Sequence, residues 1–413
     1  MSCPTEEIDQ PLSPPGGRPV SGVVLPVVLM LCVQALVSMS AVAIPVLMPV
    51  AAGDLQVPAS TVGIFMSMIY LSATLFAPVS GNLVDRIGPI GVSQICLGFC
   101  ALGLAVISIP HMSMMLLGTL IMGIGYGPVT PASSHLLVRT TPASMMSVVF
   151  SIKQTGVPVG GALAGAIVPP LVILCGWKVS ALWVGAFSLV LVGALQPYRR
   201  RFDAERRSGA YPPSWKHLFD PVKMVLRHRE LRELAVASFF FSAMQLCLIS
   251  FLVAYVIEDF NMTLIQAGLL LSIAQVSGVI GRVVWGALAD RSRRPRAVLG
   301  LLGIGMAAGA LATAAISPGW SYTAVLVTCA LFGAAAIGWN GVYLAEVARI
   351  ATPQHAGTAT GGTLFFTFCG ILIGLPAFSL LVQRTGSYPL VFGIIALATL
   401  FCGVALLVPR SSR

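Results

Sequence analysis

The chain has 413 residues, of which 57% are hydrophobic and only 9% are charged, and its mean hydropathy is +0.91. Soluble domains carry about a quarter charged residues, so this composition excludes a water-soluble protein and indicates one that crosses a membrane many times. The formal net charge is +10. Nine cysteines are scattered singly and provide neither the spacing of a metal site nor a disulfide framework.

Apolar segments long enough to span a bilayer follow one another along almost the whole chain. A spanning helix needs about 20 largely apolar residues, and this rule predicts twelve of them. The segment 1–19 is polar and rich in Pro and Gly, so it is expected to be a disordered cytoplasmic tail. It has no basic region of the kind found in a cleaved signal peptide. The predicted spans are approximately 20–48, 58–80, 90–109, 112–138, 144–173, 178–197, 233–257, 263–288, 296–316, 320–346, 355–382 and 386–408.

The basic residues predict the orientation. With both termini in the cytoplasm, nearly all Lys and Arg fall on the inner side, and the outer loops keep Lys178 and Arg384 beside Asp54, Glu258 and Asp259. This placement accounts for the net charge without a nucleic-acid partner. The basic segment 198–232 is interpreted as a solvated face that fixes the topology, with contact to anionic lipids as a second possibility.

The two halves of the chain resemble each other. The sequence Gly81-Asn82-Leu83-Val84-Asp85-Arg86 has a second copy, Gly286-Ala287-Leu288-Ala289-Asp290-Arg291, 205 positions later. Gln34 matches Gln245 at an offset of 211, and Tyr70 matches Gln275 at the offset of 205. The predicted organisation is therefore a tail at 1–19, a six-helix bundle at 20–197, a cytoplasmic linker at 198–232, a second bundle at 233–408 and a tail at 409–413.

Twelve spans with a G-x-L-x-D-R hairpin after the second and the eighth resemble the major facilitator superfamily. The resemblance implies an all-α membrane protein with twelve transmembrane helices in two pseudo-symmetric six-helix bundles, which alternate around a central site. The family pattern usually continues with Gly and two basic residues. This chain keeps Gly88 but has Pro89-Ile90 where the basic pair is usual, whereas the second copy is followed by Arg293, Arg294 and Arg296.

The repeated hairpin is the candidate gate. Its glycines would allow a neighbouring helix to approach closely, and its aspartates could face the positive end of a helix from the other half. The resemblance implies that the aspartates latch the cytoplasmic side while the central cavity faces out. The alternative is a charged turn that only fixes topology. The candidate gating residues are Gly81, Asp85, Arg86, Gly286, Asp290 and Arg291.

Lys153 is the strongest candidate for contact with a transported solute. It lies about nine residues into the predicted fifth span, or about 13 Å at 1.5 Å per residue, and no acidic residue occurs mid-span to pair with it. A cation at that depth is expected to be functional, because an anionic solute would supply the missing charge. The alternative is that the span begins later and Lys153 extends to the cytoplasmic interface.

Further polar residues lie near the middle of predicted spans, where they could bind a solute or only join neighbouring helices. Arg282 belongs to a string, G-R-x-x-W-G-x-L-x-D-R, that is similar to one in monocarboxylate and oxalate-type members of the superfamily, in which this arginine can contact a carboxylate. Alternatively, Arg282 pairs with Asp290 or with backbone carbonyls. The other candidates for substrate binding are Gln34, Tyr70, Tyr126, Gln245, Gln275, Trp339 and Asn340.

His135 and Glu346 occupy equivalent positions near the cytoplasmic ends of the fourth and tenth spans. Histidine titrates near neutral pH, so the two residues are weak candidates for carrying coupled protons. The alternative is an interfacial role without proton transfer. No carboxylate stands out at mid-membrane depth.

These features predict a multi-pass transporter in a bacterial-type inner membrane, secondary active or facilitative, that takes up a small organic anion such as a carboxylate or aromatic acid. The alternatives are efflux of drugs or amphiphilic compounds, transport of a neutral metabolite or vitamin, and a transport-inactive sensor. The sequence Gly156-Val157-Pro158-Val159-Gly160-Gly161 departs from the G-P-x-x-G-G pattern of antiporters. An enzyme, a cofactor and a bound metal are not expected, since no nucleophile–base pair, metal cluster or phosphate loop is present. A monomer in the lipid bilayer is expected.

Overall fold

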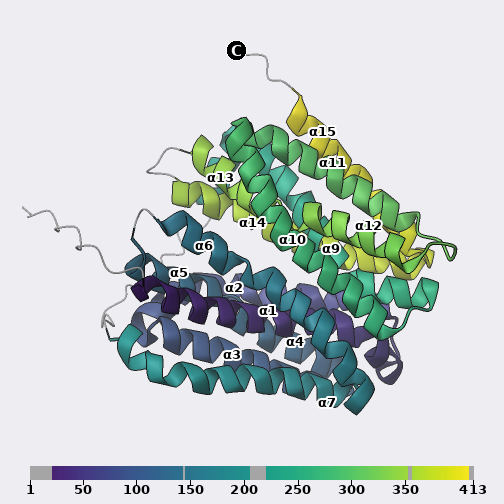
Figure 1. Cartoon of the computed structure of the whole chain (residues 1–413), viewed down its shortest axis with the longest axis horizontal. Coiled ribbons are helices and arrows are strands. Elements are labelled where there is room, and N and C mark those ends of the chain that lie inside the picture. The colour runs from purple at the N-terminus through teal and green to yellow at the C-terminus, as the bar shows by residue number, and fades with distance from the viewer. Residues whose placement is uncertain (1–20, 143–144, 205–219, 352–355, 409–413) are drawn as a thin grey trace, which may run out of the picture.

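The structure is a computed structural model that describes residues 21–142, 145–204, 220–351 and 356–408, and every element within these ranges is helical (Figure 1). The helices of the N-terminal half are α1 (Ser21–Leu55), η1 (Ala59–Thr61), α2 (Val62–Ile87), α3 (Pro89–Ile107), α4 (Met112–Tyr126), α5 (Val129–Thr140), α6 (Met146–Gln154) and α7 (Gly156–Phe202). Those that follow are α8 (Asp220–Arg227), α9 (Arg229–Phe260), α10 (Leu264–Ser292), α11 (Pro295–Ala314), α12 (Tyr322–Ala336), α13 (Asn340–Ile350), α14 (Ala356–Thr385) and α15 (Tyr388–Leu407).

The described helices account for twelve membrane crossings. Eleven helical segments are long and apolar enough to span a bilayer. One of them, Ile152–Phe202, has 51 residues, which is more than twice the roughly 20 residues that one crossing needs. The chain turns within it at Gly176, whose φ of +75° lies in the left-handed region that glycine adopts readily. The predicted all-α fold with twelve transmembrane helices is therefore confirmed.

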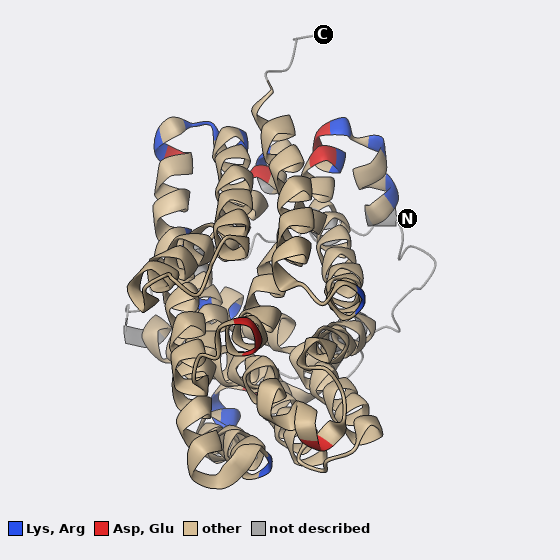
Figure 2. Cartoon of the chain, turned by 90° about the vertical axis from the view of Figure 1, so that its right-hand side faces the viewer, with Lys and Arg blue, Asp and Glu red and all other residues tan. Residues whose placement is uncertain are grey.

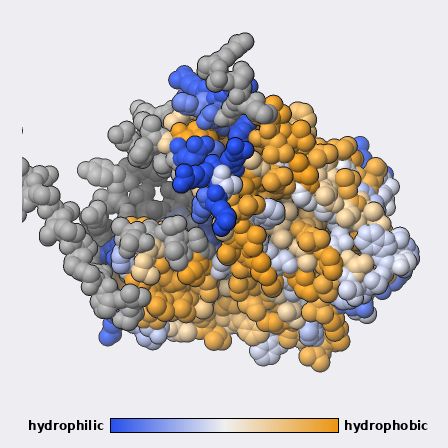
Figure 3. All heavy atoms as spheres, turned by 45° about the horizontal axis from the view of Figure 1, so that its top comes forward, coloured by the Kyte–Doolittle hydropathy of each residue, from blue (hydrophilic) through white to orange (hydrophobic). Residues whose placement is uncertain are grey.

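The helices form two bundles that lie side by side. In Figure 1, α1 to α7 form the lower bundle and α9 to α15 form the upper one. Charged residues occupy short stretches in a ribbon that is otherwise uncharged (Figure 2), and much of the described surface is hydrophobic (Figure 3). A surface of this kind fits contact with lipid chains rather than water.

The two ends of the bundles differ in charge. We call the end that carries Arg86, Arg139, Arg199, Arg296 and Arg349 the basic end, because these residues lie at the termini of α2, α5, α7, α11 and α13. At the opposite end, Lys178 Nζ lies 2.9 Å from an Asp54 carboxylate oxygen, and the Trp177 indole donates to the same oxygen at 3.1 Å. The outer-loop residues Lys178 and Asp54 are thus neighbours at one end.

Two of the crossings are broken at equivalent points. The fourth crossing is divided into α4 and α5 at Gly127, and the tenth into α12 and α13 near Gly338. These glycines are 211 positions apart, the same offset that relates Gln34 to Gln245. A third break, at Thr155, separates α6 from α7. A broken helix leaves backbone carbonyls without their usual partners, so each break offers acceptors inside the protein.

Helices occupy the described parts of the predicted linker 198–232. α7 continues to Phe202, α8 forms within the segment, and α9 begins at Arg229. Val225 of α8 is fully buried, Met224 packs against the same core, and α8 contacts α9 and α14. Short apolar stretches between polar residues thus dock α8 on the C-terminal bundle.

The halves contact each other closely toward the opposite end. The Ser379 hydroxyl donates to the Ser60 carbonyl at 2.7 Å, and the Ser272 hydroxyl donates to the Ala162 carbonyl at 2.8 Å. In Figure 1 the bundles converge toward this end and diverge toward the end that carries α5, α6 and α13. The conformation is therefore closed at the opposite end.

Candidate functional site

Lys153 is buried next to the break between α6 and α7. It lies seven residues after Met146, the first residue of α6, or about 10 Å along the helix. Its side chain is only 1% exposed, and its ammonium donates to the Thr130 hydroxyl at 3.4 Å. Within the described residues it has no carboxylate partner. The side chain does not extend to solvent in this structure, so a buried cation stands with a single weak polar contact.

Arg282 joins the two halves at two helix breaks. Its Nε donates to the Ile337 carbonyl at 3.1 Å, where α12 ends, and its Nη1 donates to the Gln154 carbonyl at 3.0 Å, where α6 ends. Pairing with Asp290 was one alternative from the sequence, but the structure shows the other, a pair of backbone carbonyls. Gln154 follows Lys153 in the chain, so Arg282 contacts the backbone directly after Lys153.

Further candidates lie near Arg282 and the break between α6 and α7. Tyr70 and Tyr126 form an edge-to-face pair with ring centroids 5.5 Å apart, and Tyr126 lies within electrostatic range of Arg282. Gln34 is buried beside Gly156, and its Oε1 atom has no hydrogen-bond partner among the described residues. Gln275 of α10, in the C-terminal half, packs against Gly161 of α7. Gln34 is thus a buried acceptor next to the start of α7.

The candidates of the C-terminal half form a separate hydrogen-bonded cluster. The Gln245 carbonyl oxygen accepts from the Trp339 indole at 2.9 Å and from the Asn340 amide at 3.2 Å. Trp339 is fully buried. Both donors directly follow the break at which the Ile337 carbonyl accepts a hydrogen bond from Arg282. This cluster therefore stabilises the backbone that Arg282 contacts.

The proton-coupling candidates lie in different surroundings. His135 is half-buried in α5. Glu346 is buried and forms a bidentate ion pair with Arg349, at 2.6 and 2.7 Å. This carboxylate raises the pKa of the Arg349 guanidinium. This bidentate ion pair favours a structural role for Glu346.

The hairpin residues are only partly described. The side-chain surroundings of Gly81 and Asp85 lie outside the described residues, whereas Arg86, Asp290 and Arg291 are exposed. No heavy atom within the described part of the chain lies within 4 Å of the point that a Cβ at Gly286 would occupy. The expected close helix approach at Gly286 is thus not made in this conformation, because the halves diverge at this end.

Sequence reasoning missed one residue that organises the first hairpin. Asp203, directly after α7, is buried and accepts hydrogen bonds from the Ile90 and Gly91 amides, each at 2.9 Å. These amides belong to the first turn of α3, whose free N–H groups attract a carboxylate. The signal in the sequence is weak: an acid two residues after a run of three arginines.

The fold and this geometry define a class of protein: a duplicated helical membrane protein with a polar site where its halves meet is built to pass solutes across the membrane. The model of the Major Facilitator Superfamily matches residues 30–368. The chain belongs to this superfamily and is a multi-pass membrane transporter of small solutes.

Characterised relatives and solved structures agree with this assignment. The chain is 21% identical to a hexuronate transporter of Bacillus subtilis (strain 168), over 83% of this chain and 77% of the relative. It is 24% identical to a benzoate transport protein of Acinetobacter baylyi (strain ATCC 33305 / BD413 / ADP1), over 81% and 77%. A POT family transporter crystallised with a thioalcohol-conjugated peptide has a similar fold, with a TM-score of 0.74, 13% identity, and coverage of 92% and 95%.

Proposed function

We propose that the protein takes up a small organic anion by alternating access, with both termini in the cytoplasm, and that the anion binds beside Lys153, near the helix break that Arg282 contacts. The observation that carries the proposal is the buried ammonium of Lys153, which contacts a hydroxyl at 3.4 Å and has no carboxylate among the described residues. A cation in this position costs free energy unless a ligand supplies the opposite charge.

The surrounding groups suit a carboxylate on a compact body. Arg282 provides a planar fork that matches the two oxygens of a carboxylate, and two of its N–H groups are held at present by backbone carbonyls. Tyr70 and Tyr126 would add ring faces and hydroxyl groups, and Gln34 a polar contact. The hexuronate and benzoate transported by the two named relatives are both carboxylates, which supports this substrate class. The proposed mechanism involves binding and reorientation without a chemical step.

The test compares an acid with its neutral isostere. Purified protein is exposed to benzoate, a hexuronate and benzamide, and the shift of its melting temperature reports binding, because a ligand of the folded state stabilises it by mass action. We expect at least one acid to stabilise the protein and benzamide to have no effect. The acid that binds is then followed as a radiolabelled solute in proteoliposomes.

The matched variants are Lys153→Gln and Lys178→Gln. Each removes one ammonium, but Lys178 lies at the opposite end, paired with Asp54. Since a hydrogen bond to a charged group contributes about 1.5–3 kcal/mol, Lys153→Gln should weaken the apparent affinity about tenfold or more. Lys178→Gln should leave it unchanged. Equal stabilisation by benzamide, or undiminished acid binding by Lys153→Gln, would instead indicate a carrier of neutral solutes.

A further inference from the structure

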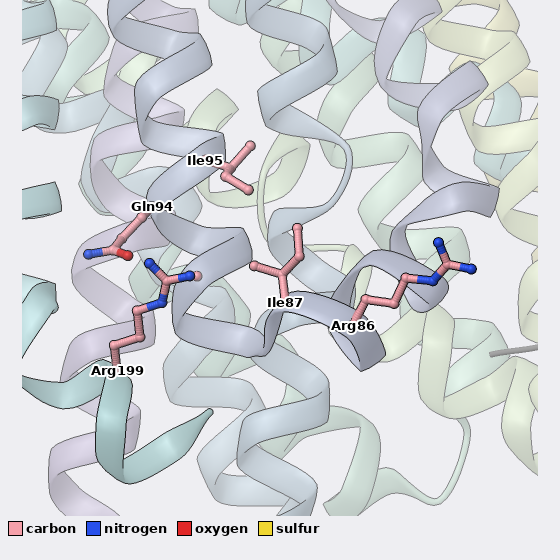
Figure 4. Close-up of a pocket in the computed structure, with 6 residues that line it drawn as sticks. Arg86, Ile87, Gln94, Ile95 and Arg199 are labelled. Carbon is pink, nitrogen blue, oxygen red and sulfur yellow. The ribbon is translucent and has the colours of Figure 1, made fainter. Parts of the chain in front are cut away.

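A pocket lies at the basic end, and neither Lys153 nor Arg282 lines it. Its volume is about 490 Å³, and it is formed by the end of α2, the first two turns of α3 and the end of α7. Figure 4 shows five of its lining side chains. The lining residues are Arg86, Ile87, Gly91, Gln94, Ile95 and Arg199.

The pocket adjoins the hydrophobic outer surface. Ile95 is partly exposed, and Leu102, two turns later on the same face of α3, is 51% exposed. On α7, Leu189 and Val190 are exposed as well. Apolar faces of this kind are covered by lipid chains in a membrane protein. The pocket therefore lies where a lipid-facing surface reaches the polar end of the bundle.

Two arginines line the pocket. Arg199 is 37% exposed, and its Nε lies 3.7 Å from an Asp203 oxygen, within the range of an ion pair but beyond hydrogen-bond distance. The two Asp203 oxygens also accept from the Ile90 and Gly91 amides. Arg86 is exposed on the other side of Ile87, and its guanidinium points away from Arg199 in Figure 4. The Asp203 carboxylate is thus shared between Arg199 and two backbone amides.

We propose that this pocket binds the phosphate-bearing head group of an anionic lipid, with the lipid chains against Ile95 and Leu102. One guanidinium can donate two parallel hydrogen bonds to the oxygens of a phosphate. Basic residues at a membrane surface also attract anionic lipids. The Gln94 amide N–H groups are occupied by the Val192 carbonyl and the Gln196 side chain, so Gln94 would contribute only its oxygen or its shape. The pocket is therefore specified mainly by its arginines.

The test uses two double variants with the same loss of charge. Arg86→Gln with Arg199→Gln removes both cations of the pocket. Arg200→Gln with Arg201→Gln removes two exposed arginines that directly follow Arg199 but do not line the pocket. Binding of phosphatidylglycerol and of phosphatidylcholine to the intact protein is measured by native mass spectrometry, and melting temperatures are recorded with each lipid and with inorganic phosphate.

We expect phosphatidylglycerol to bind in preference to phosphatidylcholine and to raise the melting temperature. The pocket variant should bind phosphatidylglycerol about thirtyfold more weakly, because two basic residues near the surface at roughly 1 kcal/mol each contribute about 2 kcal/mol, whereas the control variant should resemble the wild type. If the double pocket variant does not fold, Arg86→Gln and Arg200→Gln are compared in the same way.

Other outcomes would overturn the proposal. Equal weakening in both double variants would mean that general surface charge, not the pocket, attracts the lipid. An absence of preference for the anionic lipid would mean that no such site exists. Stabilisation by inorganic phosphate that the pocket variant alone loses would assign the site to a soluble phosphate compound rather than a lipid.

Discussion

Asp203 stabilises the turn between α2 and α3, which lacks the basic pair that is usual at this point in its family. The first hairpin has Pro89-Ile90 where its family has a basic pair. Pro89 has no N–H group and is well suited to a first helical position, and the next two amides are bound by Asp203. Gly88 has a φ of +92°, and a Cβ there would overlap the Asp203 side chain. The carboxylate and the glycine therefore depend on each other.

We expect Asp203→Asn to destabilise the protein. An asparagine offers one oxygen to two backbone donors and brings an NH₂ group toward them, and it removes the charge favoured at a helix N-terminus. We expect the free energy of unfolding to fall by about 1–2 kcal/mol, seen as a lower melting temperature in detergent. Asp290→Asn, in the second hairpin, changes an exposed residue and should have little effect. Similar losses in both variants would contradict the capping role.

At the scale of the helix, α7 carries two rows of glycines, one packed within its own half and one against the other half. Gly156 and Gly160 lie against α1, whereas Gly161 and Gly165 lie against α10 of the other half. A Cβ at Gly165 would overlap the Gly268 carbonyl oxygen, and a Cβ at Gly268 would overlap that of Gly165. Such backbone contact is possible only between small residues.

Gly165→Ala should therefore weaken closure at the opposite end. The added methyl group meets backbone, which cannot rotate away, so α7 and α10 must separate. In a background without the native cysteines, we expect Ser60→Cys, buried in this conformation, to react several-fold faster with a membrane-impermeant thiol reagent when Gly165→Ala is present. Gly193→Ala is the matched control on the same helix, because its Cβ would have open space. Unchanged reactivity with Gly165→Ala would show that the contact does not hold the end closed.

The helices themselves followed from the sequence, but their breaks did not. Hydropathy over about 20 residues predicts a crossing, and it averages over a local interruption such as Gly127 or Gly338. Backbone carbonyls were one alternative for the partners of Arg282, but the particular acceptors, Ile337 and Gln154, lie at the breaks near Gly338 and Thr155, which hydropathy does not locate. Asp203 acts on amides more than 110 positions away, and a contact at that separation is set by the packing of α3 and α7.

On the scale of the whole molecule, the proposed alternating access makes this structure one member of a pair of conformations. The halves meet at the opposite end, through η1, α2 and α14 as well as α7 and α10. Alternation requires these contacts to separate while the basic end closes. The gate proposed for Asp85 and Asp290 belongs to that other conformation, which agrees with the exposed position of Asp290 here.

Joining the closed end covalently should stop transport. Ser379 donates to the Ser60 carbonyl at 2.7 Å, so cysteines at both positions can be joined by a short thiol-specific reagent with a cleavable disulfide. In proteoliposomes we expect solute uptake to fall to the level of empty vesicles after cross-linking and to recover on reduction. Each single cysteine variant, treated in the same way, should retain its uptake. Full activity of the cross-linked protein would exclude alternation at this contact.

The bond between Arg282 and Gln154 has a kinetic consequence for the proposed anion site. In this structure, the peptide carbonyls at two helix breaks already accept from the guanidinium that a solute carboxylate would need. An empty carrier must give up the Gln154 carbonyl with nothing in its place if the halves rotate apart there, whereas a loaded carrier exchanges it for a solute carboxylate. Reorientation without a bound solute would then be the slow step of the transport cycle. Such a protein would exchange one anion for another faster than it accumulates either.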